Sequence, residues 1–435
     1  MPSELPLPSA EPSSTSPGLS RRALLTTIGL GAGALALGLS GCAPAGSRTT
    51  TIRFFQTKPE VVGYFDDLID KFHDSQSRIR VVHDSTSLIA PQFVRGDPPD
   101  LACYNYNLEN ARYIERGVLT DLSDLPEAKR IKSDIQSLVD QYGTYPGRTS
   151  ALPYSLGAAA VIYNKEIFAA NDVAVPTTWT ELLDACRTFQ DAGVTPIYGT
   201  YKDTWTSQQG AFDYTTGGAI DVDGFYEALA DEGADVSDSS PVSFEKDFAD
   251  PTKKMLELRE FTNADAASRG YADGNLAFAK GEAAMYFQGP WAFGEIAKTA
   301  PDLDVGGFPL PMTDSPDDLK VRVNLDLSLW IPTSSAKQEA AREFLTFLMT
   351  PEVMDTYNAD NLCFGVTTDA PPVTDPRIAE LQTYIDDGDF YQGAGTYIPN
   401  SIPVGNYIQS ALLGGTAEAM LRNLDDDWRR LAQRS

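Results

Sequence analysis

The sequence predicts an α/β fold with a mostly parallel sheet, and three observations support this prediction. Short β-branched and aromatic runs, which are typical of strands, occur at residues 52–55, 79–82 and 100–104. Apolar side chains recur at helical spacing between the first two runs, from Val61 to Ser75. The chain has 435 residues, 42% of them hydrophobic, which suffices for a sizeable core and for two or more domain-sized units. Strands that alternate with helices indicate βαβ units and hence a parallel sheet.

The alternation continues toward the C-terminus. Two more apolar runs predict strands, over residues 158–163 and 321–331. Helical spacing of apolar residues predicts three more helices, over residues 178–192, 337–349 and 408–432. Thr178 and Glu181 fit a capping box at the start of the first of these helices. Gly414 and Gly415 are expected to break the last one.

The first 41 residues have the features of an export signal. Residues 1–19 are rich in Pro, Ser and small side chains and carry too little apolar surface to fold. Arg21 and Arg22 precede an uncharged apolar run, Ala23–Leu39, whose length and Gly/Ala content are typical of a signal-peptide core. The Arg pair resembles a twin-arginine export signal, although ordinary secretory signals also carry such pairs. An uncleaved membrane helix is the alternative interpretation of the apolar run.

The apolar run ends in Leu39-Ser40-Gly41-Cys42, which resembles the bacterial lipobox. In lipoproteins with this motif the Cys receives a diacylglyceryl group, and cleavage before it makes it the mature N-terminus. The resemblance therefore implies a lipid anchor at Cys42, and two acyl chains hold a protein stably at a membrane. Residues 42–51 are mostly small and polar, and we expect them to form a flexible tether.

The charge of the chain limits its ligands. The 61 acidic and 34 basic residues give a net charge of −27. Removal of residues 1–41 takes away two acidic and two basic side chains, so the net charge stays the same. A surface this acidic argues against nucleic acid and anionic lipid as partners, because phosphate binding depends on Lys and Arg. It suits a neutral ligand.

Cysteine and histidine usage argues against metal and cofactor chemistry. The cysteines other than Cys42, which are Cys103, Cys186 and Cys363, are too widely spaced for a metal-ligand cluster. They either include one disulfide or are three buried thiols. The chain has two histidines and no HExxH, GxSxG or P-loop pattern. We therefore expect no metal, no cofactor and no His-dependent catalysis.

Five segments match one known family. They include FAKGEAAMYFQGPWAF, residues 278–293, which has the form F..G.AAM...GPW. The others are residues 100–122, 152–197, 323–357 and the tail to Leu431. In these segments the chain resembles the family 1 extracellular solute-binding proteins, the carbohydrate receptors of ABC importers. The match spans nearly all of the predicted mature chain.

The resemblance implies a two-lobed, type II periplasmic-binding-protein-like fold with the ligand in a cleft between the lobes. Each lobe is expected to be a mostly parallel sheet flanked by helices. By matching position, the first lobe comprises residues 48–154 plus 309–363, and the second comprises residues 155–308 plus 364–435. The lobes are expected to close on the ligand by a hinge motion.

The function that the resemblance implies is that of a receptor without enzymatic activity. The protein would be a monomer, anchored by lipid to the outer face of the cytoplasmic membrane. It would capture a neutral carbohydrate, most simply an oligosaccharide. It would then deliver the sugar to an ABC permease that works with a cytoplasmic ATPase.

Sugar binding needs aromatic planes for the C–H face of the ring, and polar groups for its hydroxyls. Trp291 follows Gly289-Pro290, where the family places a stacking aromatic, so we expect it to bind the ligand. Trp205 lies in the polar, Gly-rich stretch 201–218 and is either exposed at the site or tucked under this loop. Tyr154 stands at the first expected crossing between the lobes and either lines the cleft or packs in the hinge.

Ligands of open α/β sheets sit beyond the carboxyl ends of the strands. Five further residues are candidates on this ground, namely Phe55, Gln56, Asp84, Tyr104 and Asn107. In the maltose-binding member of the family, a Trp and an Asp match Tyr104 and Asn107. The change at both positions leaves the particular sugar open.

Asp326 interrupts the apolar run 321–331, where a carboxylate is costly unless it is paired or lies at a site. We therefore count it among the expected ligand-binding residues. The remaining tryptophans are expected to pack in the core, namely Trp179, Trp330 and Trp428.

Two other functions stay open. A secreted glycoside hydrolase needs two carboxyl groups at a fixed separation, and 61 acidic residues make any such pair unspecific. A peptide-binding receptor lipoprotein has a similar two-lobed fold, but the five segments fit the sugar receptors better.

Overall fold

The computed structural model describes residues 49–141 and 143–434. The predicted export signal, Cys42 and most of the predicted tether lie outside these described residues. Within them, nine strands form one sheet with the order β2-β1-β3-β8-β4-β6-β5, while β7 pairs with β4 and β9 with β8. The strands are β1 (Thr50–Phe55), β2 (Ile79–Asp84), β3 (Leu101–Tyr104), β4 (Leu152–Asn164), β5 (Thr195–Ile197), β6 (Ala283–Gln288), β7 (Val305–Phe308), β8 (Val321–Trp330) and β9 (Phe390–Gln392).

The sheet is mixed. The parallel pairs that the sequence predicts lie toward its two ends, where β1 pairs with β2 and β3, and β5 pairs with β6. The central strands β4 and β8 pair with each other antiparallel, and so do β3 with β8 and β4 with β6. The antiparallel centre arises because β4 and β8 run in opposite directions between the two ends of the sheet.

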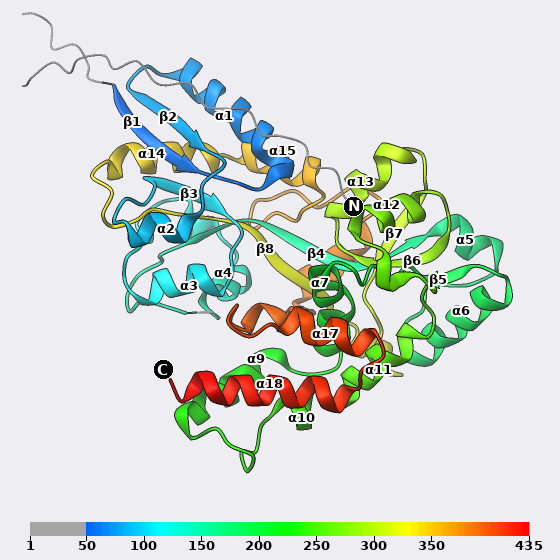
Figure 1. Cartoon of the computed structure of the whole chain (residues 1–435). Coiled ribbons are helices and arrows are strands. Elements are labelled where there is room, and N and C mark those ends of the chain that lie inside the picture. Colours follow the sequence, from blue (N-terminus) through cyan, green and yellow to red (C-terminus); the bar gives the residue numbers. More distant parts are fainter. Residues whose placement is uncertain (1–48, 142, 435) are drawn as a thin grey trace, which may run out of the picture. The chain divides into compact units, whose positions relative to one another are not determined.

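The long strands β4 and β8 connect two groups of strands (Figure 1). Residues 152–159 of β4 pair with β8, on the side of β1, β2 and β3. Residues 160–164 of β4 pair with β6 and β7 instead. All thirteen residues of β4 are buried, as expected of an apolar strand covered on both faces. This arrangement brings segments far apart in the sequence to both sides of the crossing strands.

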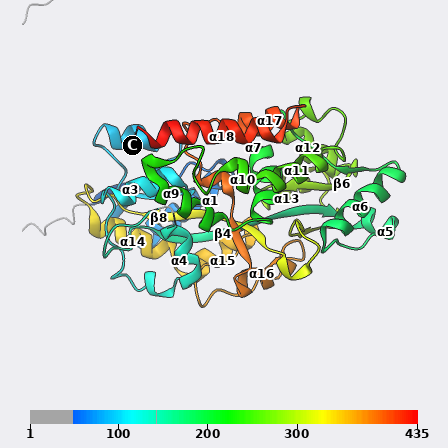
Figure 2. The ribbon, with the colours of Figure 1, turned by 90° about the horizontal axis from the view of Figure 1, so that it is seen from below.

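Helices cover both faces of the sheet. Figure 2 shows α17 and α18 on one side of β4 and β8, and α14, α15 and α16 on the other. The α-helices are α1 (Val62–Ser75), α2 (Ile89–Val94), α3 (Leu108–Glu115), α4 (Ser133–Asp140), α5 (Lys165–Ala170), α6 (Trp179–Asp191), α7 (Thr204–Ser207), α8 (Asp213–Gly217), α9 (Val222–Glu232), α10 (Phe244–Asp247), α11 (Ala249–Arg259), α12 (Tyr271–Ala279), α13 (Trp291–Thr299), α14 (Gln338–Leu348), α15 (Pro351–Asn361), α16 (Gln382–Asp387), α17 (Val404–Leu412) and α18 (Ala417–Ala432).

The elements predicted from the sequence are present, with small differences at their ends. The predicted strand at 158–163 is longer, because β4 begins at Leu152. The predicted capping box is present in part. The Thr178 hydroxyl accepts from the backbone N–H of Glu181, as expected, and the Glu181 carboxylate accepts most closely from the backbone N–H of Thr177, at 2.8 Å. The break at Gly414-Gly415 separates α17 from α18.

The core contains the tryptophans assigned to it. Trp330 is fully buried, Trp179 is buried, and Trp428 is half-buried against the main apolar cluster. The three cysteines in the described part of the chain are buried free thiols, so the second of the two interpretations applies to them. No helix in the described ranges is both long and apolar enough to cross a bilayer.

Candidate functional site

A cavity of about 310 Å³ lies where the two groups of strands meet. Its wall combines Trp291 from α13, Asn324 and Asp326 from β8, Lys58 from the loop after β1, and Gly157 from β4. These five residues thus come from four parts of the chain that the crossing strands bring together. Among the residues predicted to bind ligand, Trp291 and Asp326 line this cavity.

Strand β8 gives the cavity a polar wall. Its sequence, VRVNLDLSLW, alternates polar and apolar residues. Successive side chains of a strand point to opposite faces, so Arg322, Asn324, Asp326 and Ser328 share one face. The apolar residues between them are buried in the main apolar cluster on the other face. Within Val321–Trp330, Asn324 alone is half-buried while the rest are buried.

Three side chains hold the Asp326 carboxylate. Lys58 Nζ donates to Oδ1 at 2.5 Å, while the Tyr357 hydroxyl and the Ser155 hydroxyl donate to Oδ2 at 2.7 and 3.1 Å. Burial opposes the charge on Lys58, but the Asp326 carboxylate and other nearby groups outweigh it and raise the pKa of Lys58 above its ordinary value of 10.5. Asp326 is therefore both paired and at the cavity, the two conditions under which a carboxylate is tolerated in an apolar strand.

Trp291 opens α13 and is half-buried. Its indole N–H donates to Gln288 Oε1 at 3.2 Å, which fixes the orientation of the ring. A Cβ atom at position 289 would collide with this ring, so the glycine before Pro290 makes room for it. The ring packs against both apolar clusters of the protein. One part of Trp291 thus supports the fold, while the exposed remainder lines the cavity.

Tyr271 contacts both Trp205 and Trp291. The ring centroid of Trp205 is 5.0 Å from that of Tyr271, and the Tyr271 hydroxyl donates to the backbone oxygen of Trp291 at 3.3 Å. Trp205 is 38% exposed, which is high for so large an apolar side chain. Trp205 does not line the cavity, so its predicted role in ligand binding stays a prediction.

The charges in the cavity wall are largely compensated. The ion pairs that involve wall residues are Lys58–Asp326, Lys298–Glu295 and Arg377–Asp375. Side-chain hydrogen bonds from Arg377 hold the pKa of Asp375 below its usual value. In the described part of the chain, no group of His, Cys, Asp and Glu side chains is arranged to hold a metal ion. The wall also contains the carboxylates of Glu60 and Asp360, for which no ion pair is found among the described residues. An indole, amides and carboxylates together suit a neutral ligand with hydroxyl groups.

Comparison with known proteins places the chain in a family. Residues 59–355 match the family model described as bacterial extracellular solute-binding protein. The chain belongs to this family. An uncharacterized ABC transporter extracellular-binding protein of Pyrococcus horikoshii is 26% identical over 402 residues, which cover 84% of this chain and 86% of the relative. The multiple sugar-binding protein of Streptococcus mutans is 22% identical over 314 residues, which cover 71% and 73%.

Solved structures share the fold of this solute-binding protein. Ligand-free RafE from Streptococcus pneumoniae matches with a TM-score of 0.74 at 20% identity, over 89% of this chain and 99% of RafE. RafE in complex with raffinose matches with a TM-score of 0.73, also at 20% identity, over 88% of this chain and all of that one. At this level of identity the likeness establishes the type II periplasmic-binding-protein-like fold, as predicted, and the ligand is a separate question.

Three predicted ligand residues of this solute-binding protein are buried away from the cavity. Phe55 and Tyr154 pack in the main apolar cluster, and Tyr154 lies 5.2 Å from Tyr357, ring to ring. Gln56 is fully buried, and neither atom of its amide has a partner among the described residues. The Tyr154 ring packs against Phe65 of α1 and Tyr357 of α15, so of its two alternatives the buried position agrees with packing rather than with lining the cavity. Its role in ligand binding, like that of Phe55 and Gln56, stays a prediction.

The other three predicted residues lie at the carboxyl ends of the strands, as expected, but they have local partners. The Asn107 side chain caps α3 by accepting from the N–H groups of Glu109 and Asn110. Asp84 accepts from Gln92 Nε2 at 3.0 Å. Tyr104 is half-buried at the end of β3, next to Phe55. These contacts give each residue a structural role and leave the proposed ligand contacts untested.

Lys58, Gly157 and Asn324 line the cavity but were not predicted from the sequence as part of the site. Lys58 is 268 residues from its partner Asp326, a distance in sequence that no local pattern bridges. Asn324 had a usable signal, because it stands two residues before Asp326 and therefore shares its face of the strand. Gly157 had none, since a glycine in a buried strand is also compatible with plain packing.

Proposed function

We propose that this solute-binding protein is a lipid-anchored receptor that captures a neutral oligosaccharide and delivers it to an ABC importer. The observation that carries the proposal is the wall of the cavity, to which Trp291 of α13 and the polar residues Asn324 and Asp326 of β8 all contribute. An indole plane suits the C–H face of a sugar ring, and the amide, ammonium and carboxylate groups suit its hydroxyls. The relatives named for sugar binding support the choice of ligand class.

The proposed division into lobes follows the predicted boundaries. The first lobe comprises residues 48–154 plus 309–363, and the second comprises residues 155–308 plus 364–435. By these boundaries the cavity is lined from both lobes, with Asn324 in the first and Trp291 in the second. Closure of the lobes about β4 and β8 would then bring the two sides onto the sugar. The closed monomer is the form that the permease would recognise.

The proposed anchor at Cys42 serves delivery. A receptor held at the membrane stays near its permease, which raises its local concentration there. Replacement of the cysteine in a Cys42→Ser variant is expected to move the protein from the detergent-extractable membrane fraction to the soluble exported fraction. An unchanged distribution between the two fractions would contradict lipid anchoring at this residue.

A thermal-shift screen tests the function. Protein without residues 1–42 is heated with mono- and oligosaccharides and, as the competing class, with short peptides. A ligand at 100 times its Kd stabilises the folded state by about 2.7 kcal/mol, so a true ligand raises the Tm measurably. We expect at least one oligosaccharide to do so and to be recovered intact. Hydrolysis of the sugar would favour the glycoside hydrolase, and stabilisation by peptides alone would favour the peptide receptor.

A further inference from the structure

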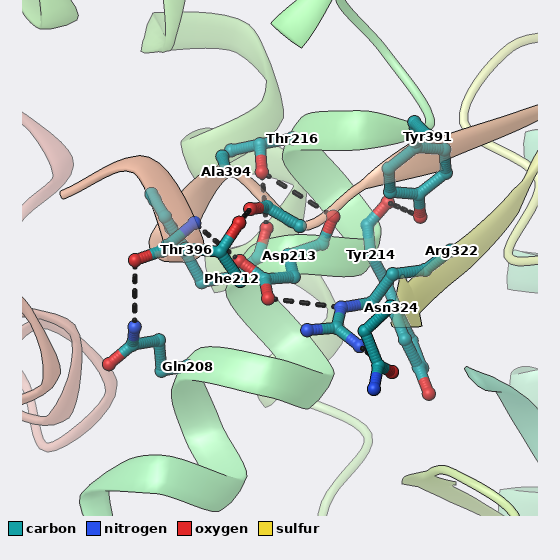
Figure 3. A network of polar contacts seen from close by, with 12 residues as sticks. Gln208, Phe212, Asp213, Tyr214, Thr216, Arg322, Asn324, Tyr391, Ala394 and Thr396 are labelled. Atoms are coloured by element: carbon teal, nitrogen blue, oxygen red, sulfur yellow. Dashed lines mark hydrogen bonds and ion pairs between the residues drawn. The ribbon is translucent and has the colours of Figure 1, made fainter. Parts of the chain in front are cut away.

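A buried ion pair joins β8 to α8 next to Asn324, one of the residues that line the cavity (Figure 3). Arg322 extends from β8 toward Asp213 at the start of α8, and its Nε donates to Asp213 Oδ2 at 3.1 Å. The two side chains are 2% and 1% exposed. The other oxygen, Asp213 Oδ1, accepts from the backbone N–H of Gly395 at 2.8 Å. With the charges compensated at this depth, neither side chain can turn without leaving a buried charge unpaired.

The same guanidinium fixes a neighbouring amide. Arg322 Nη1 donates to Asn324 Oδ1 at 3.2 Å, and the two residues are two positions apart on the same face of β8. The two ends of an asparagine amide look alike in most structures, and the surrounding hydrogen bonds decide which is which. Here chemistry decides it, because a guanidinium carries donors and no acceptor. The oxygen of Asn324 must therefore face Arg322, and its NH₂ group must face away.

The NH₂ group of Asn324 is available to a ligand. Asn324 lines the cavity beside Asp326 and is the half-buried position of β8. Among the described residues, Asn324 Nδ2 has no hydrogen-bond partner. It is also not one of the fully buried side-chain atoms without a partner, so it is accessible from the cavity. Gly157 pairs with Asn324 across the strands, and a Cβ atom there would lie 3.5 Å from Asn324 Oδ1. A larger residue at position 157 would extend over the amide, whereas glycine leaves it open.

We propose that Asn324 is a ligand-binding residue that donates a hydrogen bond to an oxygen of the bound carbohydrate, and that Arg322 and Asp213 are positioning residues that fix the direction of this donor. The proposal rests on the proposed function. The bound carbohydrate must then carry a hydroxyl or acyl oxygen that accepts a hydrogen bond from Asn324 Nδ2. The neighbouring Asp326 can only accept when ionised, so the two side chains require opposite hydrogen-bonding partners and give the wall a defined polarity.

The variant Asn324→Asp tests the donor. It keeps the size of the side chain and still accepts from Arg322, but it presents an oxygen where the NH₂ group was. Raffinose, maltotriose and N,N′-diacetylchitobiose are titrated by calorimetry into the purified full chain and into the variant. For whichever sugar binds, we expect a Kd roughly tenfold or more higher in Asn324→Asp, with the ligand-free Tm nearly unchanged. A Kd within twofold of that of the unaltered protein would overturn the proposal.

The variant Arg322→Lys tests the positioning role. Lysine keeps a positive charge for Asp213 but cannot reach both partners with a rigid fork. If Arg322 acts through Asn324, Arg322→Lys raises the Kd several-fold in the unaltered background and adds nothing in an Asn324→Ala background. Equal effects in both backgrounds would show a general structural role and overturn this part. Failure of all three sugars to bind the unaltered protein would instead contradict the proposed function, on which the inference rests.

Discussion

The Lys58–Asp326 pair offers a quantitative test of how the polar wall is held. In the variant Lys58→Met, the Asp326 carboxylate loses the partner at 2.5 Å and keeps the hydroxyls of Tyr357 and Ser155. Removing one partner of a buried pair costs about 3–5 kcal/mol. The Lys58 and Asp326 side chains are 17% and 10% exposed, and two donors remain. Because of this partial exposure and these donors, we expect a cost below that range, about 2–3 kcal/mol of unfolding free energy.

The double variant Lys58→Met/Asp326→Leu completes the test. Replacing both members of a buried pair by apolar residues of similar volume is often close to neutral. We thus expect the double variant to be more stable than Lys58→Met alone, in urea unfolding followed by fluorescence at pH 7 without ligand. A cost below about 1 kcal/mol for Lys58→Met, or additive costs in the double variant, would refute the reasoning.

Three further predictions concern pH, the cavity and the indole. The contribution of Lys58 to stability is the difference in unfolding free energy between the unaltered protein and Lys58→Met. This contribution should be constant below about pH 10.5 and fall above it, because the folded state keeps a proton on Lys58 that the unfolded chain releases. A contribution that grows with alkaline pH would contradict this sign. The variant Gly157→Val should weaken sugar binding at least roughly tenfold by filling the cavity, with a small change in ligand-free Tm, and unchanged calorimetric affinity would show that the cavity is not the site. The variant Trp291→Ala should abolish sugar-dependent fluorescence change and also lower the Tm by a few degrees, because part of the ring packs in the core; a full loss of folding would make Trp291 a core residue alone.

The sequence predicted most of the fold because its elements carry local signals. The apolar spacing of α1 and α14 and the Gly414-Gly415 break are readable along the chain, and the observed elements agree with them within a few residues. The antiparallel centre of the sheet was not predicted. It depends on β4 and β8 running in opposite directions side by side, and no feature of either strand alone shows its neighbour.

The site was only partly predictable, for a related reason. Asp326 and Trp291 stood out, one as a carboxylate in an apolar strand and the other in a family motif. Phe55 and Gln56 occupy the expected edge of the sheet, yet their side chains point into the packed interior. Lys58 and Asn324 line the cavity because of where the folded chain places them, next to Asp326 and Arg322 respectively. Which residue at a strand end lines the cavity is decided by packing between segments that are far apart in the sequence, beyond the reach of local patterns.

A crystal structure of the protein grown with a bound oligosaccharide tests the central claim most directly. We expect density for a sugar ring against the indole of Trp291, with a sugar oxygen within hydrogen-bonding distance of Asn324 Nδ2. Sugar density at a place that contacts neither residue, with the cavity between α13 and β8 empty, would contradict the claim.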